Sequence, residues 1–311
     1  MIINKQTIEP GENVMLKFPV GRIPSGTRIG IHAHVFRSKQ PGPTMLVMGG
    51  VHGDEINGVE IVRRAIVDKM FDNLKCGTVI AIPLLNIHGF INFSRDTPDG
   101  KDVNRSFPGS SVGSLSSRVA RTLTKQILPH LDFAVDFHTG GASRYNYPQV
   151  RYSAGHAPSR ELAETFAAPY TIAGKPIPRS FRKAALDKGV PVLTFEGGES
   201  IRYDGYSIQK GLDGLRRLMK LKDMSDEAPD PASTIHFTKT SWVRASHSGL
   251  FMWTQRSGAR VSLDEPLGVI NDPNGRDSFK VYAKHDGYLI GHNNASVVSL
   301  GDALFHIGYT D

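Results

Sequence analysis

The sequence contains a single cysteine, Cys76, among 311 residues. One cysteine cannot form an internal disulfide, and it cannot supply a zinc site built from several thiolates. Any metal would therefore have to be held by histidine and carboxylate side chains. A near absence of cysteine is also typical of a reducing compartment, and the N-terminal residues do not resemble a secretion signal. We therefore expect a cytoplasmic protein.

Long hydrophobic runs and blocks of basic residues are also missing. No apolar run approaches the roughly 20 residues that a membrane-spanning helix needs, so we expect no membrane association. The net charge is +7, but no run of five or six Lys or Arg and no basic stripe interleaved with aromatics is present. We therefore expect no nucleic-acid partner. A solvated basic surface is the first interpretation of the charge, and an anionic small substrate is the second.

Predicted strands and helices alternate over the first two-thirds of the chain. Residues 28–36 alternate between polar and apolar side chains, as an antiparallel strand does. Continuous apolar runs, which indicate buried strands, lie at residues 44–48, 78–85, 133–138 and 190–195. Apolar spacing typical of amphipathic helices occurs at residues 58–71, 116–128 and 205–224. This alternation predicts an α/β fold, a layered sheet with helices on both faces.

The pattern changes near residue 224. Residues 223–231 are acidic, contain prolines and have no periodicity, so we interpret them as a linker. Beyond about Thr234, short alternating strands recur between turn signals, and no good helix candidate remains. We therefore predict two domains. The first spans residues 1–228 and begins with a β segment at 1–38, and the second is a small all-β domain at residues 229–311.

Two polar motifs directly follow predicted buried strands. The motif GGVHGDE places His52 and Glu55 at a turn between a strand and a helix, and His138 follows the strand 133–137. Loops at the carboxyl ends of strands in open α/β sheets are where ligands bind. Two imidazoles and one carboxylate suit Zn²⁺ and leave a fourth position for water, which is typical of a catalytic site. Taken alone, each histidine would more often be structural.

Two further motifs offer a base and cations. Glu196 lies in FEGG at the end of a predicted strand, where it would be either a general base for a metal-activated water or a turn carboxylate. Arg95 and the segment Asp102–Arg105 (DVNR) could bind a carboxylate or an oxyanion. That role requires the loop 86–108 to fold back over the metal. Isolated arginines are otherwise surface groups.

Together and in this order, GGVHGDE, DVNR, DFHTGG and FEGG resemble the motifs of the succinylglutamate desuccinylase/aspartoacylase family, a branch of the zinc carboxypeptidase superfamily. The resemblance covers roughly residues 40–220. It implies a three-layer α/β/α, zinc-carboxypeptidase-like sandwich with a mixed sheet, followed by a small C-terminal all-β domain. It also implies one Zn²⁺ per chain and a possible homo-oligomer.

The resemblance implies a role for each motif residue. It assigns the metal to His52, Glu55 and His138, and it makes Asp102 the carboxylate that orients a ligand histidine. It assigns the substrate carboxylate to Asn104 and Arg105, the oxyanion to Arg95, and the catalytic base to Glu196.

The expected reaction is hydrolysis of the amide bond of a small, anionic N-acyl amino acid by zinc-activated water. Two alternatives stay open. A zinc carboxypeptidase acting on peptides would use the same site, and a catalytically silent binding protein would keep the same fold. Arg144, Tyr147 and Arg151, just beyond the His138 motif, are further candidates for substrate contact or for the surface.

Overall fold

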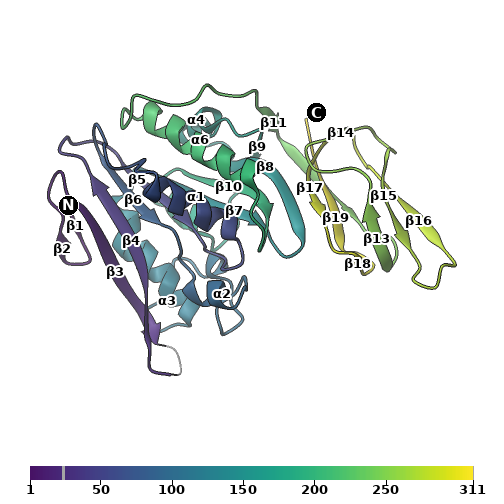
Figure 1. The fold of residues 1–311 in the computed structure, drawn as a ribbon, viewed down its shortest axis with the longest axis horizontal. Helices are drawn as coiled ribbons and strands as arrows, with labels where there is room; N and C mark the ends of the chain where they lie inside the picture. Colours follow the sequence, from purple (N-terminus) through teal and green to yellow (C-terminus); the bar gives the residue numbers. More distant parts are fainter. Residues whose placement is uncertain (23–24, 311) are drawn as a thin grey trace.

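The computed structural model describes residues 1–22 and 25–310. A long mixed sheet runs through the molecule in the order β12-β19-β17-β8-β10-β7-β5-β6-β4-β3 (Figure 1). In chain order, these strands are β3 (Asn13–Arg22), β4 (Arg28–Arg37), β5 (Thr44–Gly49), β6 (Thr78–Ile82), β7 (Phe133–Gly140), β8 (Arg144–Ser153), β10 (Val192–Glu199), β12 (Lys239–Arg244), β17 (Gly287–Asn293) and β19 (Ala303–Tyr309). A short hairpin of β1 (Ile2–Ile3) and β2 (Gln6–Thr7) precedes it.

The centre of the sheet is parallel. β5 pairs in parallel with β6 and β7, and β7 pairs in parallel with β10. Every residue of β5, β6 and β7 is buried, because helices cover both faces of such strands and leave neither face in water. β4 and β8 join this centre in antiparallel orientation. The predicted buried strands and mixed sheet are thereby confirmed.

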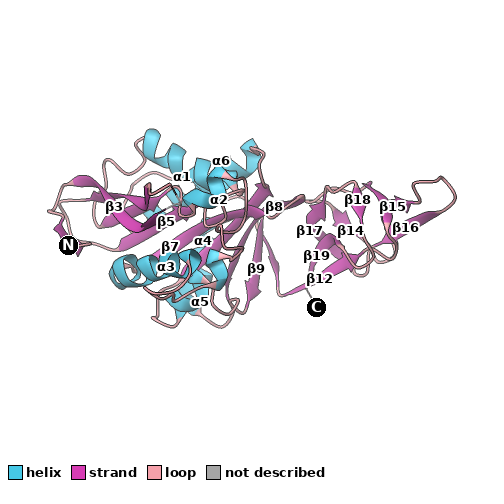
Figure 2. Ribbon diagram, turned by 90° about the horizontal axis from the view of Figure 1, so that it is seen from below, coloured by secondary structure: helices cyan, strands magenta, loops and turns pink. Residues whose placement is uncertain are grey.

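Two layers of helices enclose the sheet (Figure 2). α1 (Ile56–Val67), α4 (Ala157–Phe166) and α6 (Gly205–Leu221) pack on one face, together with Met45 and Val47 of β5. α3 (Leu115–Thr122) and α5 (Phe181–Leu186) pack on the other face, where Leu46 and Met48 point. Successive strand residues alternate between the faces, so each apolar strand supplies both cores. No helix in the described part of the chain is long and apolar enough to cross a bilayer.

Some element ends differ from the predictions. The predicted helix 58–71 ends at Val67, because Lys69 takes a left-handed backbone (φ 57°). The predicted helix 116–128 becomes α3, a π-helical turn at Leu123–Ile127 and a 3₁₀ turn at Leu128–His130. Several elements were not predicted, namely α2 (Ile87–Ile91), a 3₁₀ turn at 103–105, β8, α4, β9 (Tyr170–Gly174) and α5.

The described residues after α6 form strands and loops only, as predicted. They comprise β11 (Ile235–Phe237), β12, β13 (Gly249–Trp253), β14 (Arg260–Val261), β15 (Pro266–Asn271), β16 (Ser278–Tyr282), β17, β18 (Val297–Val298) and β19. They enclose a core of their own, which includes Phe251, Leu267 and Ile270. β17 nevertheless pairs with β8, so one sheet continues from the helix-covered part into this region. The division at residue 228 stays a prediction.

Candidate active site

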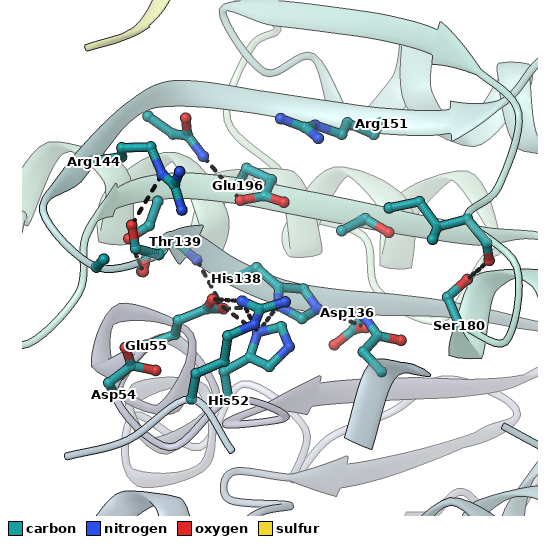
Figure 3. A pocket seen from close by; sticks show the side chains of 18 of the residues that line it. His52, Asp54, Glu55, Asp136, His138, Thr139, Arg144, Arg151, Ser180 and Glu196 are labelled. Carbon is teal, nitrogen blue, oxygen red and sulfur yellow. Dashed lines mark hydrogen bonds and ion pairs between the residues drawn. The ribbon is translucent and has the colours of Figure 1, made fainter. Parts of the chain in front are cut away.

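The three predicted metal ligands converge on one point (Figure 3). Nδ1 of His52 lies 2.8 Å from Oε1 of Glu55, and Nδ1 of His138 lies 2.8 Å from Oε2 of the same carboxylate. The two Nδ1 atoms are 3.2 Å apart. All three side chains are buried, and they could hold a metal ion between them.

The strand-to-helix turn brings these side chains together. β5 and β7 are neighbouring parallel strands with Gly49 opposite Phe137, so their carboxyl ends meet at one edge of the sheet. The turn after β5 packs tightly, since a Cβ at Gly53 would lie 1.8 Å from the carbonyl carbon of Gly89. Only glycine allows this approach, which presses the turn against the segment that leads to Arg95.

Each histidine has a carboxylate behind it. Nε2 of His52 lies 3.1 Å from Oδ1 of Asp102, and Nε2 of His138 lies 2.8 Å from Oδ2 of Asp136. A carboxylate on one ring nitrogen orients the other nitrogen toward a metal, so both Nδ1 atoms face the shared centre. Two imidazoles and a carboxylate are a donor set that suits Zn²⁺. The residues present therefore fit the ion that the motifs imply.

Neighbouring imidazole and guanidinium groups lower the pKa values of the two carboxylates in the cluster, Glu55 and Asp102. Burial alone would raise the pKa of Glu55, but the imidazoles of His52 and His138 hold it well below its usual range. Burial would also raise the pKa of Asp102, and the hydrogen bond to His52 and the charge of Arg95 hold it below its usual range. Both carboxylates are therefore anionic at neutral pH.

Arg95 reaches the cluster from the loop 86–108, which meets the condition set for its predicted role. Its Nη1 donates to Oε1 of Glu55 at 3.2 Å, and its Nη2 donates to Oδ2 of Asp102 at 2.9 Å. The guanidinium thus lies at the edge of the ligand cluster. This geometry places a fixed cation next to the point where the three donors meet.

Glu196 faces the cluster across a cavity of about 580 Å³. It lies opposite His138 in the pairing of β10 with β7, just before a bulge at the two glycines. The walls of the cavity also include Asn104 and Arg105. The side-chain oxygen of Asn104 accepts a hydrogen bond from the backbone N–H of Phe181 at 2.9 Å, which ties this loop to the start of α5.

Several other residues around the cavity have no role in the sequence motifs. Arg144 and Arg151 line the cavity, whereas Tyr147 does not and instead pairs with the hydroxyl of Tyr206 at 3.2 Å. Arg182 of α5 and Trp242 of β12 also line it. The sequence carries no signal for these two, because only the folded chain brings α5 and β12 to the cavity. Asp136 has a weak signal, because it lies two residues before His138 on the same face of a strand.

Comparison with known proteins identifies the family. Residues 41–222 match the succinylglutamate desuccinylase/aspartoacylase catalytic domain. The chain belongs to this family, as its motifs predicted, and it is an amide hydrolase, a deacylase of this group.

Particular relatives resemble most of the chain. It is 27% identical over 281 residues to an N-alpha-acetyl-L-2,4-diaminobutyric acid deacetylase from Halomonas elongata, which covers 85% of this chain and 81% of that protein. A crystal structure of a succinylglutamate desuccinylase/aspartoacylase from Rhodobacter sphaeroides superposes with a TM-score of 0.86 at 27% identity, over 96% of each chain. The product-bound ectoine utilization protein EutE (DoeB) from Ruegeria pomeroyi gives 0.87 at 24% identity, over 96% and 95%.

Proposed function

We propose that this chain is a zinc-dependent deacylase that hydrolyses the amide bond of a small, anionic N-acyl amino acid. The observation that carries this proposal is the convergence of His52, Glu55 and His138 opposite Glu196 in one cavity. A bound Zn²⁺ would polarise the amide carbonyl and lower the pKa of a water molecule toward 7. In the same proposal, residues 1–228 form a zinc-carboxypeptidase-like catalytic domain, and residues 229–311 form a small β domain.

In this proposal, other side chains of the cavity transfer the proton, stabilise the oxyanion and bind the substrate. Glu196 takes a proton from the attacking water and later delivers it to the departing amine. Arg95 stabilises the negative charge that develops on the carbonyl oxygen. Asn104 and Arg105 bind the substrate carboxylate, for which a forked guanidinium is suited.

Unsatisfied cations support an anionic substrate. Within the described residues, Nε of Arg151 and Nη1 of Arg182 are buried without a hydrogen-bond partner. Burial, together with the charge of Arg151, lowers the pKa of Arg182 to about 10. A buried donor atom without a hydrogen-bond partner is costly, and a carboxylate in the cavity would supply the missing acceptors.

The size of the cavity supports a small substrate. A volume of about 580 Å³ falls within the range of pockets that enclose small ligands. The Halomonas elongata relative is named as a deacetylase of an N-acetylated amino acid. We therefore favour an N-acyl amino acid over a peptide.

A substrate panel and one variant test the proposal. Zinc-loaded protein is assayed for amine release from N-acyl amino acids and from peptides, and chelation should abolish the release. The variant Glu196→Gln should bind as much zinc as the wild type but lose about 100- to 10,000-fold in kcat. Activity unaffected by chelation, or faster cleavage of peptides than of every N-acyl amino acid, would refute the proposal.

A further inference from the structure

The carboxylate of Glu196 is held by the amide of Asn146. Nδ2 of Asn146 donates to Oε2 of Glu196 at 3.0 Å, and no other side-chain hydrogen bond to this carboxylate occurs among the described residues. Asn146 is 7% exposed and lines the cavity from β8. The hydrogen bond fixes one oxygen of Glu196, which leaves Oε1 to receive a proton from water.

The position of the Asn146 amide depends in turn on β17. Gly291 of β17 lies directly opposite Asn146 in the pairing of β17 with β8. A Cβ at Gly291 would lie 2.9 Å from Oδ1 of Asn146 and 3.2 Å from the backbone oxygen of Tyr145. The first distance is shorter than normal van der Waals contact, so a methyl group there would displace the Asn146 amide.

The same row of paired residues continues to the far strands. His306 of β19 lies opposite Gly291, and Trp242 of β12 lies opposite His306. The Trp242 and His306 rings stack with their centroids 4.1 Å apart, and Trp242 lines the cavity. Directly opposed residues project from the same face of a sheet. The C-terminal strands therefore contribute to the face of the sheet on which the cavity opens.

We propose that Asn146 is a positioning residue that orients the carboxylate of Glu196. In the same proposal, Gly291, which lies outside the family's catalytic domain at residues 41–222, fixes the position of the Asn146 amide. The inference rests on the proposed role of Glu196 as the base. It makes the C-terminal strands part of the catalytic arrangement rather than only a neighbour of it.

The first test separates positioning from substrate binding. Asn146→Ala should lower kcat about 10- to 100-fold, as expected for a misplaced catalytic group, with KM and zinc content within twofold of the wild type. In the Glu196→Gln background, the same substitution should cause no further loss, because both changes act through one carboxylate. Asn146→Ser, which keeps a polar atom but is too short to reach Glu196, should reproduce the loss if the alanine variant folds poorly.

The second test addresses Gly291 with a matched control. Gly291→Ala should lower kcat severalfold at unchanged KM, and Asn146→Ala/Gly291→Ala should be no slower than Asn146→Ala alone. The control is Gly174→Ala at the end of β9, where a Cβ would meet nothing within 4 Å. This control should match the wild type in kcat and in thermal stability.

The outcomes distinguish this inference from the proposed function. An inactive Glu196→Gln with wild-type kcat in Asn146→Ala would overturn the inference alone, and so would a rise in KM without a fall in kcat. Wild-type kcat in Gly291→Ala would remove the contribution of β17. Full activity in Glu196→Gln would overturn both the role of Glu196 and the inference.

Discussion

At the scale of single residues, the sequence motifs located the ligand cluster but not its surroundings. His52, Glu55 and His138 could be found because they lie at or just beyond the carboxyl ends of two predicted buried strands, and the carboxyl ends of adjacent parallel strands meet. Asp136 was taken as part of an apolar strand, although it lies 2.8 Å from His138. Arg182 could not be found, because its contact with the cavity depends on how α5 packs.

Asp136 should tune the affinity for zinc. Because its carboxylate orients His138, Asp136→Asn should weaken zinc binding about 10- to 100-fold. Competition with a chromophoric chelator measures this affinity. Asp277→Asn, in the exposed turn between β15 and β16, is the control and should bind zinc like the wild type. Equal zinc affinity in the Asp136→Asn and Asp277→Asn variants would show that Asp136 is not needed to orient His138.

We expect Arg182 to lower the free energy of unfolding and also to contribute to substrate binding. Burial and the like charge of Arg151 outweigh the attraction of Glu196 and Asp136 for the half-buried Arg182 guanidinium, so Arg182→Met should stabilise the protein by about 1 kcal/mol. It should also raise KM for anionic substrates. Urea unfolding and steady-state kinetics measure the two effects. Lys183→Met, at the next position but exposed and paired with Asp187, should change neither, and a destabilised Arg182→Met would contradict the argument.

At the scale of elements, strands with polar side chains escaped prediction. β8 reads RYNYPQVRYS, which contains a proline and two arginines and lacks the apolar run of a buried strand. In the structure β8 is nevertheless a central strand of the sheet, between β10 and β17. Both of its arginines line the cavity, and Arg144 is also exposed to solvent. Strands that build a site lose the hydrophobic pattern by which strands are predicted.

β12 should limit the size of the substrate through Trp242. Trp242→Ala opens the cavity on the side of the C-terminal strands, so the ratio of kcat/KM for a dipeptide substrate to that for an N-acetyl amino acid should rise. The expected change is about tenfold, the discrimination that one or two methylene groups provide in a pocket. Trp253→Ala, on β13 and outside this cavity, is the control. An unchanged ratio would show that β12 does not restrict access.

At the scale of the whole molecule, two buried histidines make stability depend on pH. Burial lowers the pKa of His292 to about 4 and that of His306 to about 3. They lie on β17 and β19, which connect the C-terminal region to the central sheet. Below pH 6.5, His292 and His306 bind protons in the unfolded chain, but they stay neutral in the folded chain until the pH approaches their lowered pKa values. The free energy of unfolding should therefore fall as the pH drops from about 7 to about 4.

His306→Phe keeps the stack with Trp242 but does not titrate. Urea unfolding at pH 7 and at pH 4.5 should show a smaller loss of stability in this variant than in the wild type. The difference should be of the order of 1–2 kcal/mol, since one pKa unit corresponds to about 1.4 kcal/mol. His247→Phe, at an exposed position, should lose as much stability as the wild type. Parallel losses in all three proteins would exclude His306 as a source of acid sensitivity.

The pairing of β8 with β17 also determines what a shortened chain would do. Residues 144–146 form their backbone pairs with residues 291–293, so removal of the C-terminal strands would expose main-chain N–H and C=O groups along the open side of β8. Such an uncovered edge recruits strands from other molecules. Expression of residues 1–228 alone should therefore yield aggregates rather than a smaller enzyme, because the last strands also shield the sheet from self-association.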